Sequence, residues 1–166
     1  MIPINRIAIS TGGGDAPGLN AVIRSAVLAA RNRGWDVVGI RDGFNGLMFP
    51  EEYADGGVIN LSRESVRGIS HLGGTIIGST NRGNPTAFPT QQEDGTWVEV
   101  DRTHELLERF KEAGIDALVT VGGDGSLAIG NHLFQHGLRV VGVPKTIDND
   151  LDKTHVTFGF DTAVDF

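Results

Sequence analysis

The sequence predicts an α/β fold in which helices cover a doubly wound, mainly parallel β-sheet. Three observations carry this prediction. Strand-like apolar runs alternate with helical segments, glycine-rich turns directly follow individual strands, and 24 of the 166 residues are glycine. The glycines lie between periodic segments, so they indicate tight turns rather than low complexity. Alternating strands and helices are typical of a parallel sheet with helical crossover connections.

The first part of the chain contains two expected strands and one long helix. Residues 7–10 form the first strand, and a helix follows over residues 18–33, where apolar side chains repeat at helical spacing. Gly34 is suited to end this helix in a left-handed conformation. Residues 35–40 form a mostly apolar run, which is typical of a buried parallel strand.

The middle of the chain is less regular. After a loop at residues 41–46, we expect a short helix that begins at Ser62 and extends through Leu72, and a short strand at residues 75–77. Residues 84–100 interrupt the alternation, and Asp94-Gly95 between polar and apolar runs indicates a β-hairpin. We interpret this hairpin as a surface insertion.

The alternation resumes in the last third of the chain. Helices are expected over residues 103–113 and 127–136, and strands over residues 116–121 and 138–143. The whole chain is long enough for one domain with a sizeable core.

Composition excludes several classes of protein and of site. The formal net charge of −7 argues against a general nucleic-acid binder, although it leaves phosphate ligands open. The chain has no cysteine, so disulfides, cysteine-based zinc sites and thiol nucleophiles are excluded. The sequence has no apolar run long enough to span a membrane and no signal-peptide pattern. We therefore expect a cytoplasmic protein with neither a nucleic-acid nor a membrane partner.

Two glycine-rich turns each follow an expected strand and precede an expected helix. They are Gly12-Gly13-Gly14-Asp15-Ala16-Pro17-Gly18 and Gly122-Gly123-Asp124-Gly125-Ser126. Such a turn presents backbone N–H groups and the positive end of a helix dipole, and side chains would block the approach of an anion. The pair favours one polyphosphate held at the carboxyl edge of the sheet, although the first cluster alone could be a simple tight turn.

Neither turn matches the common nucleotide-binding motifs. The first is not a P-loop, because no Gly-Lys-Ser/Thr follows it, and Gly12, Gly14 and Gly18 fit the dinucleotide spacing only loosely. No acidic residue ends the second strand at Ile40-Arg41, which argues against a nicotinamide-dependent oxidoreductase.

Asp124 stands between glycines at the tip of the second turn. A carboxylate beside phosphate oxygens is favourable if Mg²⁺ lies between them, whereas without the metal it would repel the ligand. The alternative is that Asp124 caps the following helix.

A third polar segment, Pro144-Lys145-Thr146-Ile147-Asp148-Asn149-Asp150, follows the last strand. In extended backbone Asp148 and Asp150 would face the same side, and one of them could accept a proton from a substrate hydroxyl. The alternative is a run of Asx-turns in a loop. Lys145 could meet phosphate charge as a point cation, and Arg82, in a glycine-rich loop, could bind phosphate in a bidentate manner. We interpret the three segments together as a phosphoryl-transfer site.

These three segments, in this order, resemble the 6-phosphofructokinase family, and the resemblance spans the whole chain. The Thr146-Ile147-Asp148-Asn149-Asp150 segment is a highly specific signature of the family, whereas the Gly122–Gly125 turn alone also resembles that of NAD kinases and lipid kinases. The resemblance implies an allosteric glycolytic kinase that transfers a phosphoryl group from ATP, with Mg²⁺, to fructose 6-phosphate.

The resemblance also implies a role for each matching residue. Gly14 approaches the donor phosphates, Gly123, Asp124, Gly125 and Ser126 cradle them, and Asp124 engages Mg²⁺. The family's ATP-contacting arginine aligns with Asn81, so Arg82, one residue later, is expected to bind the donor on its residue type and its glycine-rich loop alone. Thr146, Ile147 and Asp148 bind the sugar phosphate, and Asp148 is the catalytic base that takes the proton of the 1-hydroxyl group.

Two positions bear on the choice of donor. Pyrophosphate-dependent members of the family carry aspartate where Gly125 stands, so Gly125 favours ATP. Lys145 is the opposite signal, because the lysine accompanies the use of pyrophosphate. The mixed pair resembles the group of phosphofructokinases in which both donors occur. We favour ATP, with the pyrophosphate-dependent fructose-6-phosphate 1-phosphotransferase as the alternative, and a non-catalytic nucleotide-binding fragment as an alternative of another class.

The last residues, 158–166, are typical of a helix start that is cut off. Members of the family are considerably longer, and their second half binds the sugar phosphate, partly across a subunit interface. We therefore expect residues 1–166 to be a single nucleotide-binding N-terminal domain without the sugar-phosphate domain. We expect little or no activity from it alone, and a homo-oligomer for the full-length enzyme.

Overall fold

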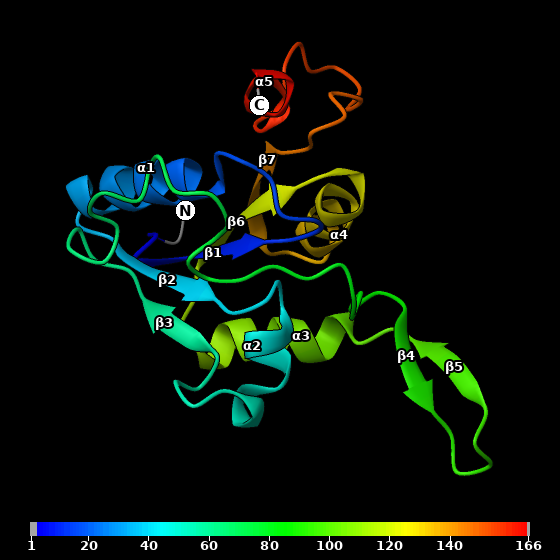
Figure 1. Ribbon diagram of the computed structural model, residues 1–166. Helices are drawn as coiled ribbons and strands as arrows, with labels where there is room; N and C mark the ends of the chain where they lie inside the picture. Colours follow the sequence, from blue (N-terminus) through cyan, green and yellow to red (C-terminus); the bar gives the residue numbers. More distant parts are fainter. Residues whose placement is uncertain (1–2, 166) are drawn as a thin grey trace.

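A computed structural model of the protein describes residues 3–165. Its main sheet has five strands in the order β3-β2-β1-β6-β7 (Figure 1). In chain order these are β1 (Arg6–Thr11), β2 (Asp36–Ile40), β3 (Val58–Asn60), β6 (Ala117–Gly122) and β7 (Arg139–Pro144). Neighbouring strands are parallel except for β3, which pairs antiparallel with β2 at one edge. The predicted mainly parallel sheet is confirmed.

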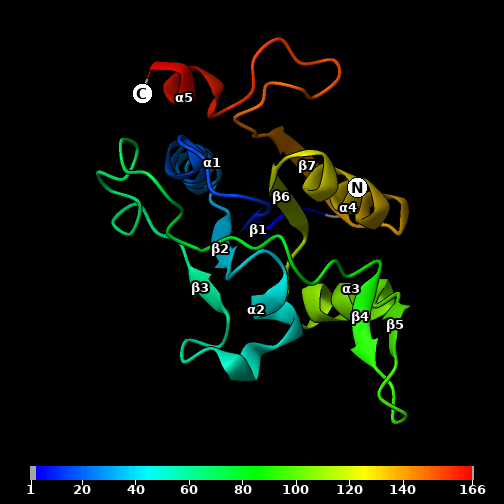
Figure 2. The same cartoon turned by 45° about the vertical axis from the view of Figure 1, so that its right-hand side comes forward.

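Helices cover both faces of this sheet (Figure 2). Helix α1 (Leu19–Asn32) packs Leu19, Ile23 and Val27 on one face, in a cluster with alternate residues of β1. The other face is covered by α2 (Asn45–Met48), α3 (Thr103–Glu112) and α4 (Asp124–Gln135). The two-residue period of a strand sends successive side chains of β1 to these two separate cores, which makes the fold doubly wound as predicted.

The order of the strands brings the three polar segments to one edge. Strands β1, β6 and β7 are adjacent and parallel, so their carboxyl ends lie side by side. The N–H of Gly12 donates to the Val121 carbonyl at 2.9 Å, and the N–H of Lys145 donates to the Gly122 carbonyl at 2.9 Å. The first turn, the second turn and the segment after β7 are thus joined by main-chain hydrogen bonds.

Two predicted elements are wrong. Residues 62–72 form successive turns rather than a helix, because Gly68 takes a left-handed conformation (φ 73°) in the middle of the segment. Residues 75–77 are not a strand, because their backbone groups bond side chains: the N–H of Ile76 donates to Asn20 Oδ1, and its carbonyl accepts from Arg41. Ile77 nevertheless packs into the core.

Three short elements are also present that the sequence pattern does not predict. These are β3, α2 and a 3₁₀ helix, η1 (Pro50–Glu52). Each has three or four residues, which is too short for a periodic apolar pattern to identify it.

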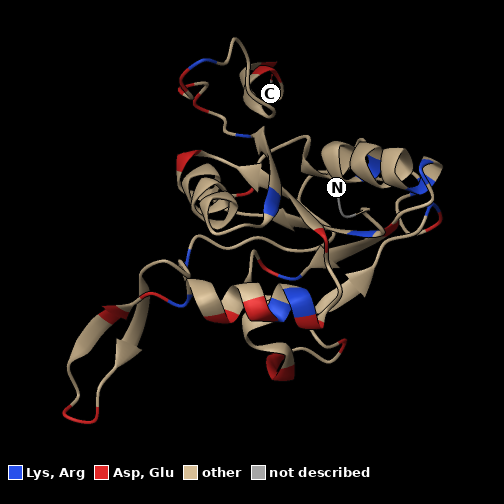
Figure 3. Ribbon diagram, turned by 180° about the vertical axis from the view of Figure 1, so that it is seen from behind, with Lys and Arg blue, Asp and Glu red and all other residues tan. Residues whose placement is uncertain are grey.

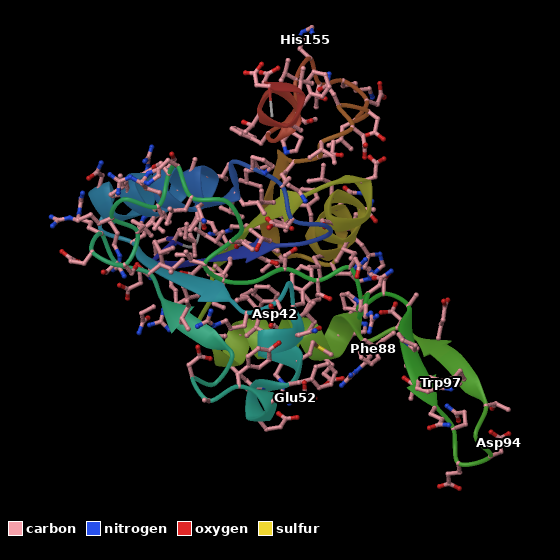
Figure 4. All side chains as sticks on the ribbon, in the orientation of Figure 1. Asp42, Glu52, Phe88, Asp94, Trp97 and His155 are labelled. Carbon is pink, nitrogen blue, oxygen red and sulfur yellow. The ribbon has the colours of Figure 1, made fainter. Side chains whose placement is uncertain are left out.

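The predicted hairpin is present as β4 (Phe88–Gln91) and β5 (Trp97–Val100). It projects away from the rest of the protein, with Trp97 and Asp94 far from the sheet (Figure 4). Its tip is acidic (Figure 3). At its base, the guanidinium of Arg102 lies over the rings of Phe49 and Phe88. The hairpin is therefore a surface insertion, as expected.

Beyond β7, residues 146–157 form a loop, and Phe158 returns to form a parallel bridge with Lys145. A last helix, α5 (Phe160–Asp165), follows, and Phe166, the end of the expected interrupted helix, lies outside the described residues. Within residues 3–165, no helix combines the length and the apolar character needed to cross a bilayer.

Candidate functional site

A cavity of about 340 Å³ opens at the carboxyl edge of the sheet. Gly12 and Gly13 of the first turn line it together with Gly123, Asp124, Gly125 and Ser126 of the second turn. The loop at residues 80–85 contributes Arg82, and Phe44 and Ile129 add apolar surface. A cavity with backbone and charged groups beside apolar side chains suits a ligand that has both a charged and a flat apolar part.

The second turn brings a helix N-terminus to this cavity. Helix α4 begins at Asp124, with Gly123 in an extended conformation (φ −83°, ψ −165°) as its N-cap residue, and no side chain caps the helix. Its first N–H groups have no intrahelical partner, and the helix dipole adds positive potential there. Asp124 is inside the helix and is not a cap, which argues against the capping alternative. This end of α4 is the part of the cavity best suited to an anion.

Glycine at positions 12 and 122 allows the two turns to pack closely. The Ser126 hydroxyl occupies the space that a Cβ on either glycine would need, and a Cβ on Gly122 would also lie 2.9 Å from the Gly12 carbonyl oxygen. Gly125 is different, because a Cβ there would meet no atom within 4 Å. Packing therefore requires glycine at positions 12 and 122, whereas the space beside Gly125 is open.

The first turn has a different arrangement from the one expected. The N–H of Gly12 and the N–H of Gly13 are already bonded, to the carbonyls of Val121 and Thr80, each at 2.9 Å. Within the described residues the N–H of Gly14 forms no hydrogen bond, but Gly14 does not line the cavity. The N-cap residue of α1, Gly18, lies against Phe158 instead. Among the helices within residues 3–165, only α4 therefore offers its N-terminus to the cavity.

Arg82 lies in the cavity wall beside Asn81. The preceding Thr80 fixes this loop, because it forms a parallel bridge with Gly12 and its hydroxyl accepts the N–H of Arg82 at 3.0 Å. Within residues 3–165 the Arg82 guanidinium forms no ion pair. An exposed guanidinium on a fixed loop can reach an anionic ligand in a bidentate manner.

Lys145 packs against the first turn but is not part of the cavity wall. Only 4% of its surface is exposed, and its ammonium donates to the carbonyls of Gly12, at 3.5 Å, and Gly14. Burial lowers the pKa of the Lys145 ammonium, and the charge of Asp15 acts in the opposite direction. Unlike Arg82, this cation is bonded to the protein's own backbone.

Residues 146–150 are not extended, so the prediction that Asp148 and Asp150 share a side by strand alternation is wrong. The Thr146 hydroxyl accepts the N–H of Asp148 at 3.2 Å, and Asn149 takes a left-handed conformation (φ 51°). A local side-chain bond and an αL asparagine turn the chain, as in the alternative of a hydrogen-bonded loop. Thr146, Ile147 and Asp148 follow β7 directly, but none of them lines the cavity.

Asp124 is the metal ligand that the sequence predicts, and it lies in the cavity wall. The described residues contain no group of three or more His, Asp or Glu side chains that could hold a metal ion by themselves. This donor set fits Mg²⁺, because Mg²⁺ in phosphoryl-transfer sites is commonly held by one or two carboxylates, with the remaining positions taken by phosphate oxygens and water.

Several residues of the cavity wall were not predicted from the sequence, among them Ser10, Gly43, Thr120, Pro85 and Ile129. Ile129 carried a usable signal, because it lies three and four residues after Ser126 and Gly125 on the same helix and therefore faces the same side. Pro85 carried none, because its position depends on how the loop folds over the edge of the sheet.

Comparison with known proteins gives a consistent result. The family model described as Phosphofructokinase matches residues 6–166. The chain is 47% identical over 165 residues to ATP-dependent 6-phosphofructokinase 1 of Synechocystis, with 98% of the chain covered. It is 45% identical to ATP-dependent 6-phosphofructokinase 2 of Clostridium perfringens, with 99% covered. The crystal structure of Pichia pastoris phosphofructokinase in the T-state superposes with a TM-score of 0.77 at 30% identity, over 96% of this chain and 17% of that one.

The chain is shorter than these proteins. It spans 44% of the length of both curated relatives, and in each case almost all of its own residues are aligned. The similarity therefore covers the whole of this chain but less than half of each relative.

Proposed function

The chain belongs to the phosphofructokinase family, and from this premise we propose that it is the nucleotide-binding part of an ATP-dependent 6-phosphofructokinase. The observation that carries the proposal is the uncapped N-terminus of α4, with its glycines, in the wall of a cavity that also holds Arg82. The names of the relatives support ATP as the donor.

We assign the donor phosphates to Gly123, Gly125, Ser126 and Arg82, with Gly14 at the neighbouring turn. Asp124 would hold Mg²⁺, which when bound neutralises developing charge on the phosphate oxygens. Phosphoryl transfer of this kind depends mainly on positioning and on electrostatic stabilisation. The backbone groups of α4 supply both, because they are fixed before the ligand arrives.

We assign fructose 6-phosphate to Thr146, Ile147 and Asp148. Asp148 would act as the general base that accepts the proton of the 1-hydroxyl group during in-line attack. Its carboxylate is exposed on the loop after β7, three residues beyond Lys145, whose N–H bonds the Gly122 carbonyl of the second turn. On this proposal the acceptor would bind beside the donor cavity rather than within it, because none of these three residues lines the cavity.

The space beside Gly125 is open, since a Cβ there would meet no atom within 4 Å. This space supports ATP, because we assign it to the α-phosphate, which an aspartate at this position would exclude. The alternative donor, pyrophosphate, was suggested by Lys145. The buried position of that lysine, away from the cavity wall, gives pyrophosphate less support.

Residues 1–166 would form one nucleotide-binding domain, and the additional length of the relatives would hold the sugar-phosphate domain. On this proposal the chain alone has little or no fructose 6-phosphate kinase activity, and the full-length enzyme is a cytoplasmic homo-oligomer with an allosteric response. Its small-molecule partners are ATP and fructose 6-phosphate.

A chimera tests the proposal directly. The chain would replace the matching N-terminal part of the Synechocystis enzyme, and turnover of fructose 6-phosphate would be measured with ATP and with pyrophosphate. We expect ATP-dependent turnover that falls about 10²-fold or more in Asp148→Asn, since the general base is removed. The exposed Asp152→Asn serves as control.

Three outcomes decide between the alternatives. Turnover with pyrophosphate alone would replace the proposed donor. A folded chimera that binds Mg-ATP without turnover would favour the non-catalytic nucleotide-binding alternative. Turnover of fructose 6-phosphate by the 166-residue chain alone would show that the proposed division between two domains is wrong.

A further inference from the structure

A buried cation joins the first glycine turn to the end of β7. Lys145 is the residue immediately after β7, and its ammonium bonds the carbonyls of Gly12 and Gly14. A Cβ on Gly13 would lie 3.8 Å from the same nitrogen. The ammonium is therefore close to all three consecutive glycines of the first turn.

Burying this charge has an energetic cost that its position must offset. Moving an ammonium out of water is unfavourable unless its protons are bonded, and two of its donors meet main-chain carbonyls here. The nearby Asp15 carboxylate is exposed, so it compensates only partly for the lost hydration. A surface lysine would avoid this cost altogether.

Lys145 adds to the bonds that hold the first glycine turn, in which the Ser79 hydroxyl also donates to the Gly13 carbonyl at 2.5 Å. Gly12 and Gly13 use their N–H groups on Val121 and Thr80, and Lys145 uses the carbonyls of Gly12 and Gly14. Three consecutive glycines have large conformational freedom, so each added bond restricts the turn strongly. In the described part of the chain, the Gly14 N–H remains without a partner in this fixed turn.

We propose that Lys145 is a positioning residue, which holds the first glycine turn in the conformation that leaves the Gly14 N–H available to a donor phosphate. This rests on the proposed function, and it departs from the interpretation of Lys145 as a direct phosphate contact. Lys145 would serve ATP and pyrophosphate equally, because it acts through the turn that both donors would meet.

Amide hydrogen exchange on the ligand-free 166-residue chain tests the fixation without any assumption about activity. In Lys145→Met, the amides of Gly12 and Gly13 should exchange about tenfold faster or more, while α3 amides keep their rates. Lys145→Arg, which retains the charge and the donors, should recover part of the protection. Lys153→Met, at a side chain that is 90% exposed, is the matched control.

Binding of ATP and of pyrophosphate to the same variants tests the role. Lys145→Met should weaken both donors by a similar factor, and Lys145→Arg should restore both. A loss confined to pyrophosphate, with unchanged exchange at Gly12 and Gly13, would overturn the proposal in favour of a direct contact. Should the wild-type chain bind neither donor, the proposed function fails, whereas the exchange rates still report on the fixation.

A measurement on the wild-type chain covers the case in which the methionine variant does not fold. The ¹⁵Nζ signal of Lys145 should be protected from exchange with water in the absence of ligand, and pyrophosphate should leave this signal nearly unchanged. An unprotected Lys145 ammonium, or one whose signal moves as strongly as the Gly14 amide, would refute the proposal.

Discussion

The Ser126 hydroxyl occupies the space that a side chain on Gly12 would need. Gly12 directly follows β1, Ser126 lies in the first turn of α4, and the two are brought together because β1 and β6 are neighbours. This contact links the glycine of one turn to the serine of the other, so the second turn cannot move without affecting the first.

The contact predicts a measurable coupling between the two residues. Gly12→Ala should destabilise the chain by about 1–3 kcal/mol, as overpacking does in a tight site. Adding Ser126→Ala should recover a substantial part of that loss, because it removes the overlapping oxygen, and the pair should be coupled by about 1 kcal/mol. Thermal and urea unfolding of the wild type, the two single variants and the double variant measure this coupling. As a control, Gly73→Ala should leave the stability unchanged, because a Cβ there meets no atom within 4 Å. If the losses of stability in Gly12→Ala and Ser126→Ala simply add in the double variant, the contact is disproved.

Asp124 should affect ligand binding and not folding, because its side chain is exposed at the start of α4. We expect Asp124→Asn to weaken Mg-ATP binding about tenfold or more, which is about 1.4 kcal/mol, and to weaken metal-free ATP much less. Calorimetric titration with Mg-ATP, and with ATP in the presence of a chelator that removes Mg²⁺, measures the two affinities separately. An equal loss in both conditions would exclude a metal role, and Asp152→Asn controls for the change in net charge.

Gly125→Asp should change the choice of donor. The new carboxylate would fill open space next to the α4 N-terminus, so the fold should be retained. Affinity for ATP should fall about tenfold or more through like-charge repulsion, while affinity for pyrophosphate falls less. Parallel titrations with both ligands measure the ratio. A ratio that does not change would mean that the α-phosphate lies elsewhere.

Asp116 should give the folded state a defined pH dependence. Its carboxylate accepts the N–H groups of Arg6 and Asn5, at 2.9 and 2.7 Å, and these bonds lower the pKa of Asp116. A carboxylate with a lowered pKa stabilises the fold above its unfolded pKa, near ~3.9, and this contribution is lost as the pH falls through the folded value.

Asp116→Asn should therefore cost about 1 kcal/mol at neutral pH, allowing for partial exposure, and progressively less below about pH 4. Urea unfolding at several pH values measures this, with Asp152→Asn as the control. A difference between wild type and variant that stays constant down to the lowest pH would contradict the assignment.

The sequence predicted the sheet because its strands are buried and apolar and are followed by glycines. β1 and β6 each have their turn within one residue of the strand end, and the alternation of apolar residues in α1 identifies its buried face. These are local signals. The segment around Ile77 has a strand-like apolar pattern, but its backbone is held by side chains and has no strand partner. No local signal distinguishes such a segment from a true strand.

The second turn was predictable because a helix follows it at once, so its geometry is fixed over a few residues. The first turn was not, since the partners of the Gly12 and Gly13 N–H groups, Val121 and Thr80, come from distant parts of the chain. Lys145 illustrates the same limit: its residue type suggested a ligand contact, whereas burial, which only the fold determines, turned its ammonium toward backbone carbonyls.

Backbone amide NMR with a non-hydrolysable Mg-ATP analogue shows whether α4 begins at a donor-phosphate site. We expect saturable shifts concentrated at Gly123–Ser126, Gly14 and residues 81–85. Saturable shifts centred elsewhere, for example near His104 and His136 where a second cavity of about 330 Å³ lies, or no shifts at millimolar ligand, would contradict it.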